Sequence, residues 1–120
     1  MKYFFLALIL IFTATLCLWP NLHPEQAVLS RYYWQADVLI HSGYYFGLTL
    51  IVCLLKLKIK PVYLFLLLGL FSIALELLQI FSDKRGVSWM DGMDNLIGIV
   101  LAILIYKLLM IRYLKKDQFA

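Results

Sequence analysis

The side chains best suited to chemistry in this sequence begin inside a long apolar run, at ELLQIF (residues 76–81). Glu76 and Gln79 follow Gly69 and Ser72 at intervals of three, four and three residues, which places all four on one face of a helix. A carboxylate within an apolar membrane helix costs about 3 kcal/mol. This face is therefore expected to point into a protein interior and to meet polar partners there.

Two other stretches contain residues that could be those partners. In DVLIHSGYY (residues 37–45), Asp37 and His41 are four residues apart, so the carboxylate can orient the imidazole, and Tyr45 follows one turn later. In RGVSWMDGMDNLIG (residues 85–98), Asp91 and Asn95 share a helical face. Three polar faces are thus expected to meet at one level of the molecule.

The chemistry open to such a site is proton transfer or anion binding. Glu76, Asp91 and His41 could act as acids and bases, and Arg85 could neutralise a carboxylate or hold a phosphate. The sequence contains no phosphate-binding loop, nucleophile elbow or short metal-ligand motif, so it predicts no cofactor and no metal. Two simpler roles stay open. The polar groups could only fix helix register, and Asp91 could only cap a helix N-terminus.

The elements that must position these groups are apolar helices. The chain has 120 residues, of which 64% are hydrophobic and 15% charged, whereas a soluble domain usually has about 25% charged residues. Four apolar runs cover residues 3–19, 36–55, 61–81 and 92–111, and about 20 such residues cross a bilayer as a helix. The sequence predicts one all-α domain over residues 1–120, a four-helix transmembrane bundle. The first run could instead be a cleaved signal peptide.

Small residues predict where these helices approach one another. Gly43 and Gly47 form a small-xxx-small pair, and Gly98 and Ala102 lie beneath Asn95 on the last run. We expect close helix packing at both pairs.

The basic residues predict the orientation of the bundle. Eight of the eleven fall at the N-terminus, between the second and third runs, and at the C-terminal end: Lys2, Lys56, Lys58, Lys60, Lys107, Arg112, Lys115 and Lys116. Basic loops favour the cytoplasm, so both termini are predicted inside and the polar site near the outer leaflet. A basic rim against anionic lipid accounts for the net charge of +4 without nucleic acid. An oligomer remains open.

The three polar stretches together resemble the VanZ-like family of small bacterial membrane proteins. The similarity covers about residues 36 to 105 and lies in these positions: Asp37, His41, Tyr45, Glu76, Gln79, Arg85, Ser88, Asp91, Asn95 and Gly98. There are departures as well. Val38 replaces a lysine of the family pattern, Ala102 replaces a glycine, and the proline before the arginine is absent.

The resemblance implies a multi-pass protein of the bacterial cytoplasmic (inner) membrane. The family takes its name from proteins that confer low-level resistance to teicoplanin, a lipoglycopeptide directed at cell-wall precursors, but the resemblance carries no particular mechanism. The expected ligand is therefore a cell-wall precursor, a lipid or a lipoglycopeptide. Two alternatives stay open: an intramembrane enzyme that acts on an envelope lipid or lipid-linked head group through Glu76, Asp91 and His41, and a proton-coupled transporter.

Overall fold

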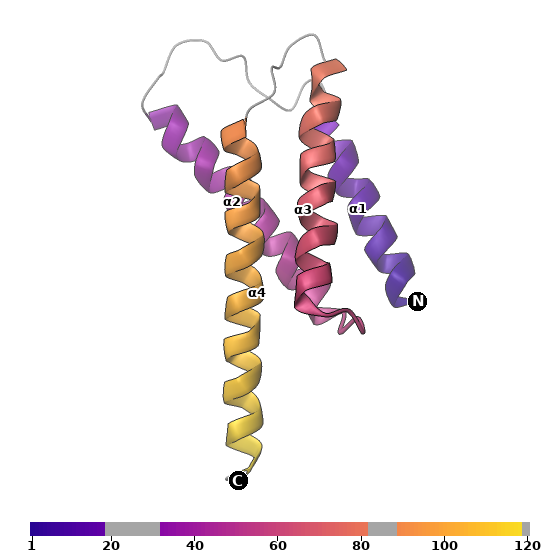
Figure 1. The fold of residues 1–120 in the computed structure, drawn as a ribbon, viewed down its shortest axis with the longest axis vertical. Helices are drawn as coiled ribbons and strands as arrows, with labels where there is room; N and C mark the ends of the chain where they lie inside the picture. Colours follow the sequence, from indigo (N-terminus) through magenta and orange to yellow (C-terminus); the bar gives the residue numbers. More distant parts are fainter. Residues whose placement is uncertain (19–31, 82–88, 119–120) are drawn as a thin grey trace.

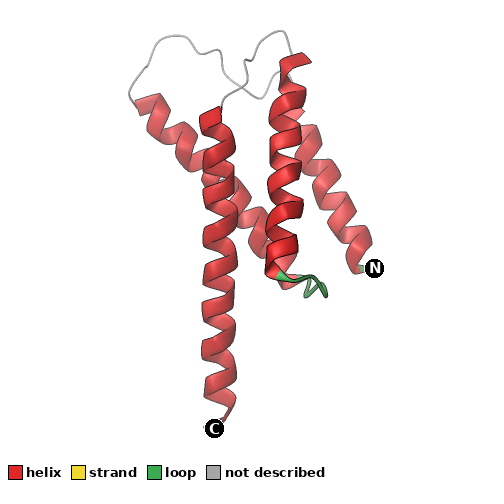
Figure 2. Ribbon diagram, viewed as in Figure 1, coloured by secondary structure: helices red, strands yellow, loops and turns green. Residues whose placement is uncertain are grey.

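The computed structural model describes residues 1–18, 32–81 and 89–118, with side chains from Val38 onward in the second segment. Apart from a loop between two of the helices, these segments are helical, and they contain no strand (Figure 2). The elements are α1 (Lys2–Leu18), α2 (Tyr32–Leu54), α3 (Pro61–Leu78), a 3₁₀ turn η1 (Gln79–Phe81) and α4 (Trp89–Gln118). The predicted all-α class with four α-helices is confirmed.

The helix boundaries differ from the apolar runs where charged residues are good helix formers. The fourth run was expected over residues 92–111, but α4 has 30 residues and continues to Gln118. Its last turns contain Lys115 and Lys116 beside leucine and tyrosine. Lysine and leucine have high helix propensity, so the helix persists after the apolar run has ended. At about 1.5 Å per residue, α4 is about 45 Å long.

The connection between α2 and α3 is a short, defined turn. Lys56 has φ 48°, the left-handed conformation that commonly ends a helix. Lys60 is extended, with φ −66° and ψ 146°, and Pro61 starts α3. Proline disfavours helical geometry in the residue before it and fits the first helical turn, so the sequence alone marks this boundary.

The four helices run in alternating directions (Figure 1). The two termini and the α2–α3 turn lie at the lower end of the view, and the end of α3 and the start of α4 lie at the upper end. α2 crosses α4 obliquely and packs against it more extensively than any other pair packs. α3 packs against α4 and α1.

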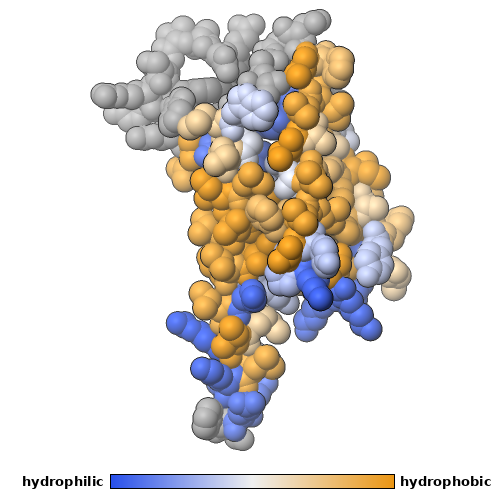
Figure 3. Space-filling view, in the orientation of Figure 1, coloured by the Kyte–Doolittle hydropathy of each residue, from blue (hydrophilic) through white to orange (hydrophobic). Residues whose placement is uncertain are grey.

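The core of the bundle is small, and most large apolar side chains face outward. Leu68 and Ile99 are fully buried at its centre, with Val52 and Leu48 beside them. By contrast, only 39% of the apolar segment of Pro61–Phe81 and 17% of that of α4 is buried. Figure 3 shows apolar residues over most of the visible middle and charged residues toward the lower end.

This exposure fits a protein that meets lipid. By length and composition, Pro61–Phe81 and Trp89–Gln118 could each cross a membrane, whereas Lys2–Leu18 and Val38–Leu54 are shorter apolar helices. The core helix of a soluble protein would have its apolar surface mostly buried, and neither of the two long helices does.

Candidate functional site

Polar side chains from three helices meet near the upper end of the bundle. We call His41, Glu76, Gln79, Asp91 and Asn95 the polar cluster. His41 comes from α2, Glu76 from the last full turn of α3, and Asp91 from the first turn of α4. One ligand-type atom from each of these three side chains lies within 4.8 Å of the other two. The structure therefore brings together residues that are up to 50 positions apart in the sequence.

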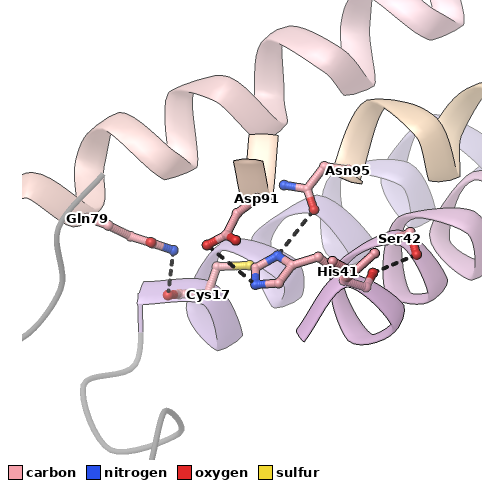
Figure 4. Close-up of polar contacts among 7 residues, drawn as sticks. Cys17, His41, Ser42, Gln79, Asp91 and Asn95 are labelled. Carbon is pink, nitrogen blue, oxygen red and sulfur yellow. Dashed lines mark hydrogen bonds and ion pairs between the residues drawn. The ribbon is translucent and has the colours of Figure 1, made fainter. Parts of the chain in front are cut away.

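Asn95 fixes the orientation of the imidazole of His41. Its Oδ1 lies 3.2 Å from His41 Nδ1 (Figure 4). Because an amide oxygen can only accept, Nδ1–H is the donor. In the neutral ring, Nε2 then carries a lone pair, and it lies 3.8 Å from Asp91 Oδ2. That separation exceeds a direct hydrogen bond.

The close approach of α2 and α4 sets the height at which these groups meet. A Cβ built on Gly98 would lie 2.2 Å from Ser42 O and 3.1 Å from Phe46 N, so the two backbones touch there. Ser42 is next to His41, and Gly98 is three residues after Asn95. Only glycine permits this contact, and the contact brings the imidazole level with the first turns of α4.

The polar face predicted for α3 is buried along its whole length. Gly69, Ser72, Glu76 and Gln79 are all buried. A Cβ on Gly69 would lie 3.1 Å from Leu96 Cδ2 of α4, a tight contact. Glu76 is 6% exposed and Gln79 is 4% exposed. Neither side chain faces the apolar exterior.

Two buried oxygens on this face have no hydrogen-bond partner among the described residues. They are Ser72 Oγ and Gln79 Oε1. Ser72 lies beside Tyr45 of α2. Tyr45 is 2% exposed and lies one turn below His41. The site is thus lined by acceptors as well as by ionisable groups.

α1 closes the remaining side of the site. Gln79 Nε2 donates to Cys17 O at 3.4 Å (Figure 4), and this carbonyl belongs to the last turn of α1, where no intrahelical donor remains. Tyr44 Oη donates to Thr13 Oγ1 at 3.0 Å and links α2 to α1. Thr13 is fully buried. These α1 contacts were not predicted, because the first run contains only isolated polar residues.

Asp94 was also missed as part of the buried surface. It is 8% exposed and lies in the second turn of α4, next to Asn95. The predicted polar face contains Asp91 and Asn95, which are four residues apart, and Asp94 was left out of it because it precedes Asn95 by one residue. Its burial shows that the polar wall of α4 is wider than a single helical stripe.

Several predicted residues lie outside the described part of the chain. Arg85 and Ser88 fall in residues 82–88, and Asp37 falls where side chains are not described. Orientation of His41 by Asp37 therefore stays a prediction. In the described residues Asn95 and Asp91 face the two ring nitrogens.

The two predicted packing pairs differ in how closely another helix approaches them. Gly98 lies directly against the backbone of α2, and Ala102 below it is fully buried. Gly43 and Gly47 have no atom within 4 Å of an added Cβ. Among the described residues, the close packing expected at this second pair does not occur, because α2 turns its Ser42 and Phe46 side toward α4 instead.

Chemically, the polar cluster offers two carboxylates, one oriented imidazole and two amides in a space closed to most solvent. Such a set can move a proton, bind a cation, or hold a polar head group. Searches of the chain against protein families, curated proteins and solved structures find no match. The chemistry of the site therefore has to be argued from its own geometry.

Proposed function

We propose that this chain is a small multi-pass protein of the bacterial cytoplasmic membrane, VanZ-like in its polar pattern, whose polar cluster binds an envelope component at the outer leaflet. The candidate ligand is a wall precursor, an envelope lipid or a lipoglycopeptide such as teicoplanin. The observation that carries the proposal is the convergence of His41, Glu76, Asp91 and Asn95 inside a bundle whose exterior is apolar.

The physical support is the energetic cost of the cluster. Carboxylates buried among apolar helices are expensive to insert, so such groups commonly mark binding or transport sites. An apolar pair of helices would pack without them. The cluster also lies at the end of the bundle away from both termini, which is the outer end if the basic residues stay in the cytoplasm.

Reporter fusions test the membrane orientation. We expect a fluorescent reporter fused after Ala120 to be bright and alkaline phosphatase at the same place to be inactive, because both termini are proposed to be cytoplasmic. The same pattern is expected for a truncation after Lys58. Active phosphatase at either position would overturn the orientation.

Drug susceptibility tests the site. We expect expression in a teicoplanin-sensitive Gram-positive host to raise the inhibitory concentration, and Asp91→Asn to abolish the increase at equal abundance. Asp117→Asn, an exposed change at the far end of α4, is the matched control and is expected to protect like the wild type. An unchanged inhibitory concentration with the wild-type chain would reject the resistance role. Full protection by Asp91→Asn would reject the role of the site.

Ligand identity can be tested without assuming a drug. Lipids that copurify with the wild-type protein are compared by mass spectrometry with those that copurify with Asp91→Asn and Asp117→Asn. We expect one envelope lipid or precursor to be depleted with Asp91→Asn alone. Identical lipid profiles for all three would contradict binding at the polar cluster.

An intramembrane enzyme is the second candidate, and a specific geometry favours it. The imidazole of His41 is oriented by Asn95, and its other nitrogen faces Asp91 at 3.8 Å. A positioned acid or base contributes about 10²–10⁴-fold to a rate. If a lipid substrate is turned over, Glu76→Gln is expected to slow turnover by at least about 100-fold while the helical content is kept. An envelope lipid profile that expression leaves unchanged would argue against this candidate.

A further inference from the structure

Three side chains of the polar cluster have the arrangement of metal ligands. The ligand-type atoms are an imidazole nitrogen of His41 and one carboxylate oxygen each of Glu76 and Asp91, all within 4.8 Å of one another. Glu76 and Asp91 are each 6% exposed. The three come from three different helices, so their meeting depends on the tertiary fold and not on a local run of acids.

The geometry of His41 is that of an oriented ligand. Donation from Nδ1–H to Asn95 Oδ1 at 3.2 Å leaves the Nε2 lone pair directed to the side of Asp91. Metal-binding histidines almost always donate their second nitrogen in this way, because the donation fixes the tautomer and the ring plane. Asn95 is 1% exposed, so this supporting contact is protected from water.

The distances suit a shared ion better than a direct contact. Two ligands that each bind a cation at about 2.1 Å lie about 3.4 Å apart at a tetrahedral angle and about 4.2 Å apart when opposite. His41 Nε2 and Asp91 Oδ2 are 3.8 Å apart, between these limits. Glu76 has three side-chain torsions, so a small rotation can bring its oxygen, which lies within 4.8 Å of the other two ligand-type atoms, into the same range.

A fourth polar atom lies on the same helical face. Gln79 follows Glu76 by three residues, and its Oε1 is buried without a hydrogen-bond partner among the described residues. A buried acceptor of this kind is costly unless a donor or a cation satisfies it. It can accept from water bound to a cation held by the three ligands.

From this geometry we propose that His41, Glu76 and Asp91 bind one divalent cation of the Zn²⁺ or Mn²⁺ type. An imidazole nitrogen favours these first-row cations over Mg²⁺ and Ca²⁺, which prefer sites made only of oxygen. Three protein ligands leave at least one coordination position open, as in metal sites that bind an exogenous ligand. The absence of a short ligand motif does not argue against the site, because its ligands are 35 and 15 positions apart in the sequence.

Zinc affinity of the purified full-length protein tests the proposal directly. The protein is prepared in detergent with a tag that contains no histidine, stripped with a chelator, and titrated with Zn²⁺ in competition with a chromogenic chelator. We expect one equivalent to bind per chain. Mn²⁺ is expected to compete more weakly, and Mg²⁺ is expected not to compete. Equal competition by Mg²⁺ would remove the imidazole from the ligand set and overturn the proposal.

Substitutions then assign the ligands. We expect His41→Gln, Glu76→Gln and Asp91→Asn each to weaken Zn²⁺ binding by at least about 100-fold, and Asn95→Ala to weaken it by about 10–100-fold through the lost orienting contact. For two control variants we expect a Zn²⁺ affinity within about two-fold of that of the wild type. Asp117→Asn changes an exposed carboxylate at the far end of α4, and His23→Gln replaces the only other histidine of the sequence, which is not a proposed ligand. Zinc binding that persists in all three ligand variants would be adventitious and would reject the site.

Folding is followed by the helical circular dichroism of every variant. Where Glu76→Gln does not fold, Glu76→Asp retains the charge on a shorter side chain and is expected to bind Zn²⁺ with intermediate affinity. Zinc is also expected to raise the melting temperature of the wild type and of Asp117→Asn, but not of Asp91→Asn. The same rise in all three proteins would contradict the proposed ligands.

The side chain of Arg85 could occupy the place of the cation, and a variant tests this alternative. Arg85 carries a cationic side chain that could neutralise Glu76 or Asp91. Removal of this charge by Arg85→Gln is expected to leave Zn²⁺ affinity equal or tighter. No Zn²⁺ or Mn²⁺ binding by the wild type at millimolar concentration, with binding gained in Arg85→Gln, would show the guanidinium in place of the ion and overturn the proposal.

The cation site stands independently of the proposed function. It requires neither the membrane orientation nor the teicoplanin assay. If the chain binds Zn²⁺ through these ligands but gives no protection from the drug, the cation site is supported and the proposed resistance role is rejected.

Discussion

Replacement of Gly98 by alanine is expected to force α2 away from α4 and to disrupt the polar cluster. The new Cβ would lie 2.2 Å from Ser42 O, whereas an ordinary contact begins at 3.4 Å, so the helices must separate by about 1.2 Å. The atoms in the way belong to the α2 backbone and cannot rotate aside. Such a shift would stretch and weaken the 3.2 Å hydrogen bond between His41 Nδ1 and Asn95 Oδ1.

The expected loss of stability follows from three terms. Overpacking costs about 1–3 kcal/mol, and the lost hydrogen bond costs about 0.5–1.5 kcal/mol. Alanine recovers about 0.5–1 kcal/mol of helix propensity. The net destabilisation is about 2 kcal/mol, or roughly a 30-fold change in the folding equilibrium.

Reversible unfolding in mixed micelles, followed by circular dichroism, measures this free energy. Gly43→Ala is the matched control, because an added Cβ there meets no atom within 4 Å. We expect this control to be unchanged or more stable by up to about 1 kcal/mol. ¹⁵N NMR of labelled histidine would separately report the loss of the Nδ1–H donation. Equal stability of Gly98→Ala and Gly43→Ala would refute the argument that the two backbones touch at Gly98.

Three further substitutions test other contacts by the same unfolding measurement. Asn95→Ala is expected to cost about 1–3 kcal/mol, because it leaves a mostly buried imidazole donor without its acceptor, and to mix the histidine tautomers in ¹⁵N NMR. Tyr44→Phe removes the 3.0 Å hydrogen bond to α1 and is expected to cost about 0.5–1.5 kcal/mol, while Tyr113→Phe on the exposed end of α4 costs nothing measurable. Leu68→Ala at the fully buried centre is expected to cost about 2–5 kcal/mol, and Leu70→Ala, which is 65% exposed, far less. Equal effects within either matched pair would contradict the assigned packing.

The apolar runs and the helix-boundary residues of the sequence were sufficient to predict much of the fold. The apolar runs gave four helices, and Pro61 marked the start of α3 because its ring fixes the backbone there. The end of α4 could not be found from hydropathy, because α4 continues through lysine-containing turns whose helix propensity is high. Apolar runs report where a helix can be buried or meet lipid, and helix formation extends further.

A meeting of the three polar faces was predicted, but the individual contacts between the helices were not. Three- and four-residue spacing placed Glu76 with Gln79 and Asp91 with Asn95, since this depends only on helical geometry. Spacing cannot say how each helix is rotated about its axis. For example, His41 Nδ1 pairs with Asn95, which is 54 residues away in the sequence, and no local pattern could predict this contact. The same limit explains why the contacts made by Thr13 and the carbonyl of Cys17 were missed.

The contact at Gly98 is also the point about which α2 and α4 would pivot if their crossing angle changed. Asn95 lies three residues from this point, or about 4.5 Å along the axis, whereas the end of α4 lies about 30 Å away. A change of about 10° in crossing angle would move the far end by about 5 Å and Asn95 by less than about 1 Å. Thicker or thinner lipid changes helix tilt. If the chain spans a bilayer as proposed, the contact between His41 and Asn95 lies close to this crossing, so we expect its geometry to change little with membrane thickness.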